Sequence, residues 1–235
     1  MVYLIVIGSD YVRLKKIRSK NDILEIVQEV GFLPFFENET EGFSIEENIA
    51  PQYWFDGETD GAWEWKGPLA SSGKCVYGKF FRGKAGFISL DWFPDFANYR
   101  RDGYDYEGFY EDGKANYKDK DIYDAITAKG SYLSKTLKRD LNYRKGGNKG
   151  FDTVITRLQM QTFVCISDFE YAVDKHGIPY GWGIARYSTP EAMFGEHFFD
   201  EIYEQKPEAS KKRLYEHLSQ ILPHASEKQI LRFIG

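Results

Sequence analysis

The sequence predicts an α+β protein with an aromatic-rich N-terminal module that contains a small β-hairpin, a middle unit of three helices and a hairpin, and C-terminal helices. Three observations favour this fold class. Apolar residues recur at helical spacing mainly in the second half, β-forming runs flank short glycine turns, and 17% of the 235 residues are aromatic. We expect the three parts to span residues 1–117, 118–190 and 191–235.

Composition restricts the class of protein. Hydrophobic residues make up 42% of the chain and charged residues 29%, as in ordinary soluble globular proteins. No stretch approaches the roughly 18 consecutive apolar residues that a membrane span needs. The two cysteines, Cys75 and Cys165, lie far apart in the sequence and form no CxxC pattern. We therefore expect a cytoplasmic protein with no membrane partner, disulfide framework, metal site or cofactor.

The first thirty residues predict one strand and one helix. Residues 1–8 (MVYLIVIG) are typical of a short buried strand. Residues 19–31 (SKNDILEIVQEVG) carry apolar side chains at helical spacing. Ser19 or Asn21 can cap the start of this helix, and Gly31 can end it.

The rest of the N-terminal part predicts irregular structure, a hairpin and a second helix. Residues 32–74 combine scattered glycine and proline with many aromatic residues, so we expect irregular structure around aromatic anchors. Two short strands follow, joined through residues 82–84. Asp91 can cap a helix over residues 92–101. Residues 102–113 (DGYDYEGFYEDG) resemble a loop and do not match a calcium-binding loop.

The middle part has the element order of a winged helix. Residues 120–130 and 134–141 predict two short helices, the second capped by Ser134. Residues 151–159 (FDTVITRLQ) show the clearest helical stripe in the chain. A hairpin follows over residues 161–188, so helix, helix, helix and hairpin succeed one another. Two further helices are expected in the tail, and Ser226 with Gln229 in the second of them has the spacing of a capping box.

Charge is unevenly distributed along a chain with a net charge of −5. Residues 37–64 contain nine acids and no Lys or Arg, whereas residues 129–149 contain seven bases and one acid. In a helix-turn-helix protein the third helix lies in the major groove of DNA and the wing meets the backbone or minor groove. We therefore expect contacts to double-stranded DNA from these residues: Lys135, Lys138, Arg139, Arg144, Lys145, Lys149, Thr153, Thr156, Arg157, Lys175 and His176.

Two glutamines stand where the predicted third helix meets the hairpin. Gln159 and Gln161, in TRLQMQTFV, are two residues apart. Side chains two apart project from one face of a strand, so the two amides are expected to reach a single ligand. The alternative is that they only satisfy backbone or interdomain hydrogen bonds.

Several runs of residues resemble one group of bacterial proteins, described as AlkZ-related. The resemblance extends from about residue 20 through GFLPFF, DGAWEWKG, YGKFF, AGFIS, WFPDFANYRRDGYD and RLQMQTFV to HGIPYGWGIARYSTPE. LQMQ also looks like the Gln-x-Gln motif of the similar AlkZ and YcaQ winged-helix DNA glycosylases, which excise bulky adducts and unhook interstrand crosslinks. The resemblance implies DNA repair by hydrolysis of the N-glycosidic bond of damaged bases, with Gln159 and Gln161 as catalytic candidates.

Such chemistry requires an unstacked nucleotide and a positioned water. A glutamine amide can orient that water, but it cannot take a proton at neutral pH. The carboxylates of Asp60 and Glu64 are the partner candidates. The neighbouring rings of Trp63 and Trp65 could stack a base, although such aromatic residues are more often part of a core.

The sequence is also compatible with two other functions. The first is a non-catalytic DNA-binding or regulatory protein. The second is an interaction module without nucleic acid, because seven bases can also be a solvated face. Likewise, the arginines of YRRDGYD can bind an anion or hold the two halves together in an Arg–Asp network.

Overall fold

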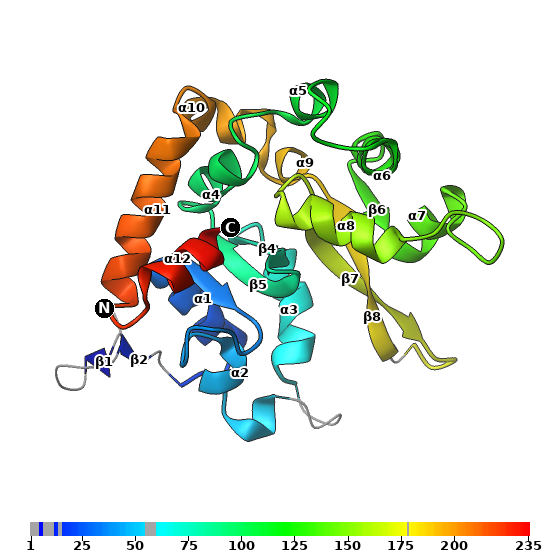
Figure 1. Ribbon diagram of the computed structural model, residues 1–235. Helices are drawn as coiled ribbons and strands as arrows, with labels where there is room; N and C mark the ends of the chain where they lie inside the picture. Colours follow the sequence, from blue (N-terminus) through cyan, green and yellow to red (C-terminus); the bar gives the residue numbers. More distant parts are fainter. Residues whose placement is uncertain (1–4, 7–11, 14–15, 55–59, 178) are drawn as a thin grey trace.

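An antiparallel sheet of six strands forms the centre of the protein, with the order β3-β5-β4-β7-β8-β6. The structure is a computed structural model that describes residues 5–6, 12–13, 16–54, 60–177 and 179–235 (Figure 1). The sheet strands are β3 (Phe32–Pro34), β4 (Cys75–Phe81), β5 (Lys84–Ser89), β6 (Ser131–Leu133), β7 (Cys165–Val173) and β8 (Pro179–Ser188). A separate two-stranded ladder joins β1 (Ile5–Val6) to β2 (Val12–Arg13).

Helices surround this sheet, and the α+β fold class predicted from the sequence is confirmed. The helices are α1 (Lys20–Val30), α2 (Ile45–Asn48), α3 (Ala62–Ala70), α4 (Phe93–Arg100), α5 (Tyr106–Glu111), α6 (Tyr117–Thr127), α7 (Ser134–Asp140), α8 (Phe151–Met160), α9 (Pro190–Phe194), α10 (Asp200–Tyr203), α11 (Pro207–Ile221) and α12 (Glu227–Ile234), with 3-10 turns η2 (Pro51–Tyr53) and η3 (Glu196–Phe199). In Figure 1, α6, α7 and α8 gather at the end of the sheet that carries β6 and β8, whereas α11 and α12 lie on the opposite side. Within the described residues, no helix has the length and apolar character needed to cross a membrane.

Helix α1 confirms the element predicted from the amphipathic pattern of residues 19–31. The Ser19 hydroxyl accepts the Asp22 N–H at 3.3 Å and so satisfies one of the free donors of the first turn. Gly31 ends the helix with φ of 87°, a backbone conformation that favours glycine. The apolar stripe of α1 is buried against the sheet strands and α3. Of the opening strand expected over residues 1–8, only Ile5–Val6 lies within the described residues.

Two helices differ from the sequence expectation. Residues 62–70 form α3 where irregular structure was expected. This helix is buried on more than one side and contains Pro68, so it lacks the one-sided periodicity that identifies a helix in a sequence. Residues 106–111 form α5 where a loop was expected; Asp105 caps it by accepting the Gly108 N–H at 2.8 Å. Both expectations were wrong.

The expected capping residues of two further helices were also wrong. Trp92 rather than Asp91 is the N-cap of α4, and Leu133 rather than Ser134 is the N-cap of α7. Neither of these N-caps accepts a side-chain hydrogen bond from its helix. The predicted Ser226 and Gln229 capping box of α12 is present.

The second hairpin is joined to strands on both of its sides. Strand β6 pairs with β8, with Tyr132 opposite Tyr187. The sequence pattern predicted no strand between α6 and α7. Strand β7 pairs with β4, with Tyr77 opposite Ile166. The hairpin of the C-terminal half and the β4–β5 hairpin of the N-terminal half therefore belong to one continuous sheet.

A buried arginine connects α4 with the chain on both sides of the second hairpin. Arg101 is 1% exposed and pairs with Glu191 of α9, with 2.7 Å between Nη1 and Oε1. Its guanidinium also donates to the Thr162 carbonyl at 2.8 Å and to the Tyr203 hydroxyl at 2.5 Å. The guanidinium carbon lies 4.7 Å from the centre of the Phe163 ring. Arg101 is thus a structural link, and its acidic partner is a glutamate far along the chain rather than a neighbouring aspartate.

Candidate nucleic-acid interface

A tight glycine turn carries three of the predicted DNA contacts, Arg144, Lys145 and Lys149. Between α7 and α8, the chain reverses through Asn142 with φ of 58° and Gly146 with φ of 84°. The Asn148 N–H donates to the Asn142 carbonyl at 2.8 Å, which closes the loop. A Cβ on Gly147 would lie 2.1 Å from that same carbonyl oxygen, so the close approach requires glycine. The turn is therefore an ordered support for the basic side chains around it.

Five exposed cations gather on α7 and this turn, and we call them the basic surface: Lys135, Arg139, Arg144, Lys145 and Lys149. Lys135, Lys145 and Lys149 make no ion pair with any described residue. Arg139 pairs with its neighbour Asp140 at 2.8 Å, and that hydrogen bond is the main cause that lowers the Asp140 pKa. Exposed pairs of this kind contribute little stability, so these cations stay available to a polyanion.

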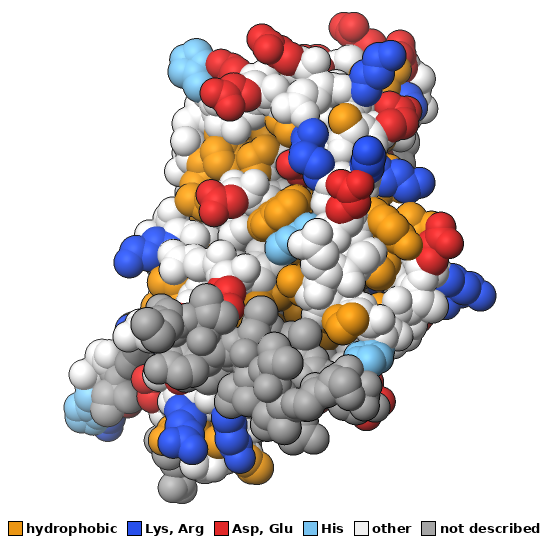
Figure 2. Space-filling view, turned by 90° about the vertical axis from the view of Figure 1, so that its left-hand side faces the viewer, with side chains coloured by type: hydrophobic (Ala, Val, Ile, Leu, Met, Phe, Trp, Pro, Cys, Tyr) orange, Lys and Arg blue, Asp and Glu red, His pale blue; other side chains and the backbone are white. Residues whose placement is uncertain are grey.

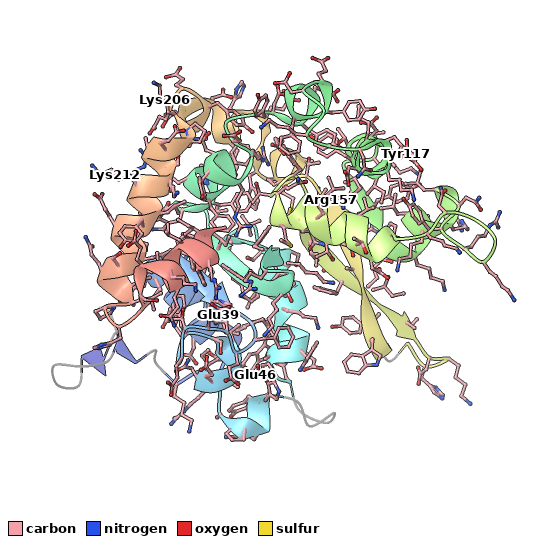
Figure 3. All side chains as sticks on the ribbon, viewed as in Figure 1. Glu39, Glu46, Tyr117, Arg157, Lys206 and Lys212 are labelled. Carbon is pink, nitrogen blue, oxygen red and sulfur yellow. The ribbon has the colours of Figure 1, made fainter. Side chains whose placement is uncertain are left out.

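Two other predicted cations are already paired with carboxylates of the protein. Arg157 contacts Asp119 of α6, with 2.5 Å between Nη2 and Oδ1, and Asp119 is 1% exposed (Figure 3). Because Arg157 compensates a buried carboxylate, it holds α8 against α6 and is less free than the basic surface. Lys138 pairs with Asp152 at 2.9 Å, and Asp152 itself is exposed on α8.

The remaining predicted contacts lie on α8 and at the hairpin tip. Thr153 is exposed on α8 and Thr156 is half-buried beside Gly83 of the β4–β5 turn. Lys175 and His176 are exposed between β7 and β8, where Asp174 closes the turn by accepting the His176 N–H at 2.8 Å. In Figure 1 the hairpin tip and the α7–α8 turn lie on the same side of the protein.

The opposite side of the protein has a different charge pattern. Figure 2 shows that acidic and basic side chains are interspersed among hydrophobic patches on the face that carries α11. Ion pairs within this part include Lys212 with Glu216 and Arg213 with Asp95. The side of the α7–α8 turn, by contrast, presents several unpaired cations together.

Gln159 is a structural residue in this fold. It is completely buried on α8, and both ends of its amide are used. Oε1 accepts the backbone N–H of Lys79 in β4 at 3.0 Å, and Nε2 donates to the Ile155 carbonyl at 3.0 Å. The amide therefore fastens α8 to β4, where the N–H of Lys79 would otherwise lack a partner.

Replacing Gln159 with alanine is expected to lower the free energy of unfolding by about 2 kcal/mol, because a buried backbone N–H loses its acceptor. Gln220→Ala, an exposed change on α11, is the comparison and should leave the unfolding midpoint unchanged. The measurement is urea unfolding followed by tryptophan fluorescence. An unchanged unfolding midpoint for Gln159→Ala would contradict the structural role.

Gln161 differs from Gln159 in its surroundings. It is the C-cap of α8, and β7 begins only at Cys165, so the expectation that both glutamines project from one strand face was wrong. The Oε1 atom of Gln161 is buried but accepts no hydrogen bond from the described part of the chain. Its neighbour Thr162 has a positive φ of 66° and binds Arg101. Of the two amides, that of Gln161 retains an acceptor for a ligand.

Of the predicted carboxylates and tryptophans, Glu64, Trp63 and Trp65 lie on α3, and Asp60 directly precedes its N-cap Gly61. Asp60 and Glu64 are exposed, and the Glu64 carboxylate accepts the Gly61 N–H at the start of the helix. Trp65 is 4% exposed and belongs to the core, whereas Trp63 is half-buried, 5.8 Å from the exposed Trp182 ring. No hydrogen bond or ring contact between described residues joins this group to either glutamine. Across the described residues there is also no group of three or more His, Cys, Asp or Glu side chains placed to hold a metal ion.

Lys66 is a chemically unusual residue that the sequence analysis missed. It is 8% exposed on α3, and its ammonium lies 5.0 Å from the centre of the Trp63 ring and 4.8 Å from that of Phe169. Burial lowers the pKa of Lys66 to about 8, against the opposing effect of Glu64. One lysine in an aromatic run gives no sign of burial in the sequence, because the ring of Phe169 comes from a strand a hundred residues away.

Comparison with known proteins supplies one further finding. No curated protein and no solved structure matches the chain. A family model described as AlkZ related matches residues 17–235, which is nearly the whole chain. The chain therefore belongs to the AlkZ-related family.

Proposed function

We propose that this protein binds duplex DNA through the basic surface, with α8 and the β7–β8 hairpin beside it. The observation that carries the proposal is the group of exposed cations on one ordered turn between two helices. Unpaired Lys and Arg side chains contact phosphates, and their binding to DNA gains free energy from the release of counterions. Membership in the AlkZ-related family supports a glycosylase-like protein.

The connectivity of the second half supports a winged-helix arrangement. The order is α6, β6, α7, α8, β7 and β8, and β6 pairs with β8 so that the three strands lie in one sheet with β8 in the middle. In this arrangement α8 takes the place of the recognition helix, and the exposed Thr153 faces the DNA. The hairpin takes the place of the wing, with Lys175 and His176 at its tip.

Duplex binding measured at about 50 and 200 mM salt tests this proposal. Five phosphate contacts would give a slope of roughly −4 to −5 in a plot of log affinity against log salt. Binding that weakens steeply with salt supports the basic surface as the binding face. The proposal fails if the protein does not bind a duplex at the lower salt concentration.

A second candidate function is excision of damaged bases, and Gln161 favours it. Its buried Oε1 accepts no hydrogen bond from the described residues, so it can accept one from a water molecule and orient that water. Such a water would attack the C1′ carbon of an unstacked nucleotide as the N-glycosidic bond breaks; the base leaves with the bonding electron pair, and the proton of the water passes to solvent because the amide cannot take it. Gln159 then has a supporting role, because it fixes the end of α8 from which Gln161 projects.

Release of bases from alkylated or crosslinked duplexes tests this second function. Gln161→Ala is expected to slow release roughly 100-fold, the lower range for losing one group that assists proton transfer or water attack. Gln220→Ala, an exposed change on α11, is the matched control and should leave the rate unchanged. Equal rates for wild type and Gln161→Ala would exclude a role for Gln161. Duplex binding without any release would support the non-catalytic alternative.

A further inference from the structure

A groove separate from the basic surface lies between α12 and the ends of the β3 and β4–β5 segments. Its volume is about 730 Å³, within the range of about 300–1,000 Å³ typical of small-molecule sites. Phe36, Phe81 and Phe233 contribute its apolar lining. The rings of Phe81 and Phe233 lie 4.7 Å apart between centres and are inclined by 32°.

Two arginines from distant parts of the chain meet at the edge of this groove. Arg82 comes from the β4–β5 turn and Arg232 from α12, and both contact the carboxylate of Glu39. The Arg232 Nη1 lies 3.0 Å from the Oε2 of Glu39, which can be located in Figure 3. The hydrogen bond from Arg232 is the main cause that lowers the pKa of Glu39. A carboxylate of the protein thus occupies the position between two guanidinium groups.

The pairing of Glu39 with these arginines is easily exchanged. The side chains of Arg82, Glu39 and Arg232 are 63%, 42% and 49% exposed, so the ion pairs are screened by water and contribute little to stability. A phosphate monoester carries more charge than a carboxylate and offers three oxygens to two planar guanidinium groups. It can therefore replace Glu39 at the two arginines, while the backbone of the glutamate stays held by Gln229.

We propose that the groove binds a nucleoside monophosphate unit, with its phosphate between Arg82 and Arg232 and its base against the phenylalanine side chains. The half-buried ring of Phe36 offers stacking surface to a base, whereas Phe81 and Phe233 are 5% and 8% exposed and form the apolar floor beside it. Lys84 lines the same groove and adds a third cation, whose ammonium donates to the Glu37 carbonyl at 2.8 Å; the carboxylates of Glu37 and Glu46 also line the groove, so the two arginines rather than net charge select the phosphate. The unit can be a free nucleotide or the terminal nucleotide of a strand, since both carry a phosphate monoester on a nucleoside.

The groove lies next to α8. A Cβ on Gly83, beside Arg82, would be 3.4 Å from the Thr156 methyl group and 3.9 Å from the Met160 sulfur. Arg100 also donates to the Met160 carbonyl and to the Phe233 carbonyl of α12. A strand that left the face of α8 would reach the groove across the β4–β5 turn. Nucleotide binding in the groove does not, however, require that the protein bind duplexes.

Calorimetric titration with AMP, adenosine and inorganic phosphate tests the proposal. AMP is expected to bind roughly tenfold more tightly than adenosine or phosphate alone, because only AMP uses both the arginines and the rings. Arg82→Ala and Arg232→Ala should each weaken AMP binding about tenfold, since each removes a charge-assisted contact. Glu39→Gln should strengthen it severalfold, because the competing carboxylate is neutralised. All three side chains are exposed, so these changes leave the fold intact.

Arg144→Ala is the matched control, because it removes a guanidinium from the basic surface and not from the groove. It should leave AMP binding unchanged. Loss of duplex binding by the basic surface can therefore be told apart from loss of nucleotide binding in the groove. The proposal is overturned if neither wild type nor Glu39→Gln binds AMP at millimolar concentration, or if the arginine variants bind as wild type does. If a 5′-phosphorylated oligonucleotide binds more tightly than AMP, the ligand of the groove is the end of a strand. If AMP binds more tightly, the ligand is a free nucleotide.

Discussion

Replacing Arg101 with methionine is expected to lower the free energy of unfolding by about 2–4 kcal/mol, because the half-buried Glu191 carboxylate loses its counter-ion and the buried Thr162 carbonyl loses its donor. The guanidinium is 1% exposed and bonds to Glu191, Thr162 and Tyr203. Methionine fills most of the volume but satisfies none of these groups. The loss is measured by urea unfolding, with tryptophan fluorescence as the probe.

Two related variants separate charge from geometry at this position. Arg101→Lys keeps the charge but cannot reach Thr162 and Glu191 together, so an intermediate loss is expected. Arg101→Met combined with Glu191→Gln removes both charges and should recover part of the stability lost in the single variant. A loss below about 1 kcal/mol in Arg101→Met would show that the network is not a structural link.

Removing three cations of the basic surface is expected to weaken duplex binding roughly ten- to a hundredfold at low salt. The variant is Arg144→Ala, Lys145→Ala and Lys149→Ala in one chain. Each phosphate contact contributes roughly 0.5–1 kcal/mol and releases counterions, so the salt slope should also fall by about 2 to 3. Fluorescence anisotropy of a labelled duplex at several salt concentrations measures both quantities.

The control removes the same charge from the opposite side of the protein. Lys206, Lys212 and Lys228 are exposed on or beside α11 and α12, and their joint replacement by alanine should leave the affinity within about twofold of wild type. Equal weakening by both triple variants would show that net charge alone governs binding, and would contradict a localised face. Melting temperatures of both variants verify that the fold is retained.

Sequence patterns predicted the elements whose formation depends on neighbouring residues. Helices α1, α8 and α12 each bury one stripe at helical spacing, and the two main hairpins have β-forming runs around glycine turns. Such features are local, so they can be recognised without knowing what lies opposite them. The position of the exposed cations on the α7–α8 turn was predictable for the same reason.

Elements defined by distant contacts were not predictable from these patterns. Strand β6 is three residues long and exists because it pairs with β8, more than fifty residues later. Helix α3 contacts α1, β4 and β7, so burial on several sides removed the amphipathic stripe that would have revealed it. In both cases tertiary structure overrides weak local preference.

The candidate sites show the same limit at the level of single side chains. The sequence predicts a ligand-binding role for the Gln159 amide, yet its Oε1 accepts the backbone N–H of Lys79, eighty residues earlier. The sequence predicts that Arg157 contacts DNA, yet its guanidinium forms an ion pair with the buried Asp119 carboxylate. The groove at Arg82 and Arg232 was not predicted because its cations come from distant parts of the chain.

The pairing of Tyr77 with Ile166 has a practical consequence for work on fragments. A piece cut from residues 118–190 would contain the basic surface and the β7–β8 pair, but β7 would lose β4, the strand that pairs with its other edge in the intact protein. The freed backbone donors and acceptors would act as a template for other copies, and such edges promote aggregation. Studies of the basic surface therefore need the intact chain, in which β4 of the first hairpin pairs with that edge.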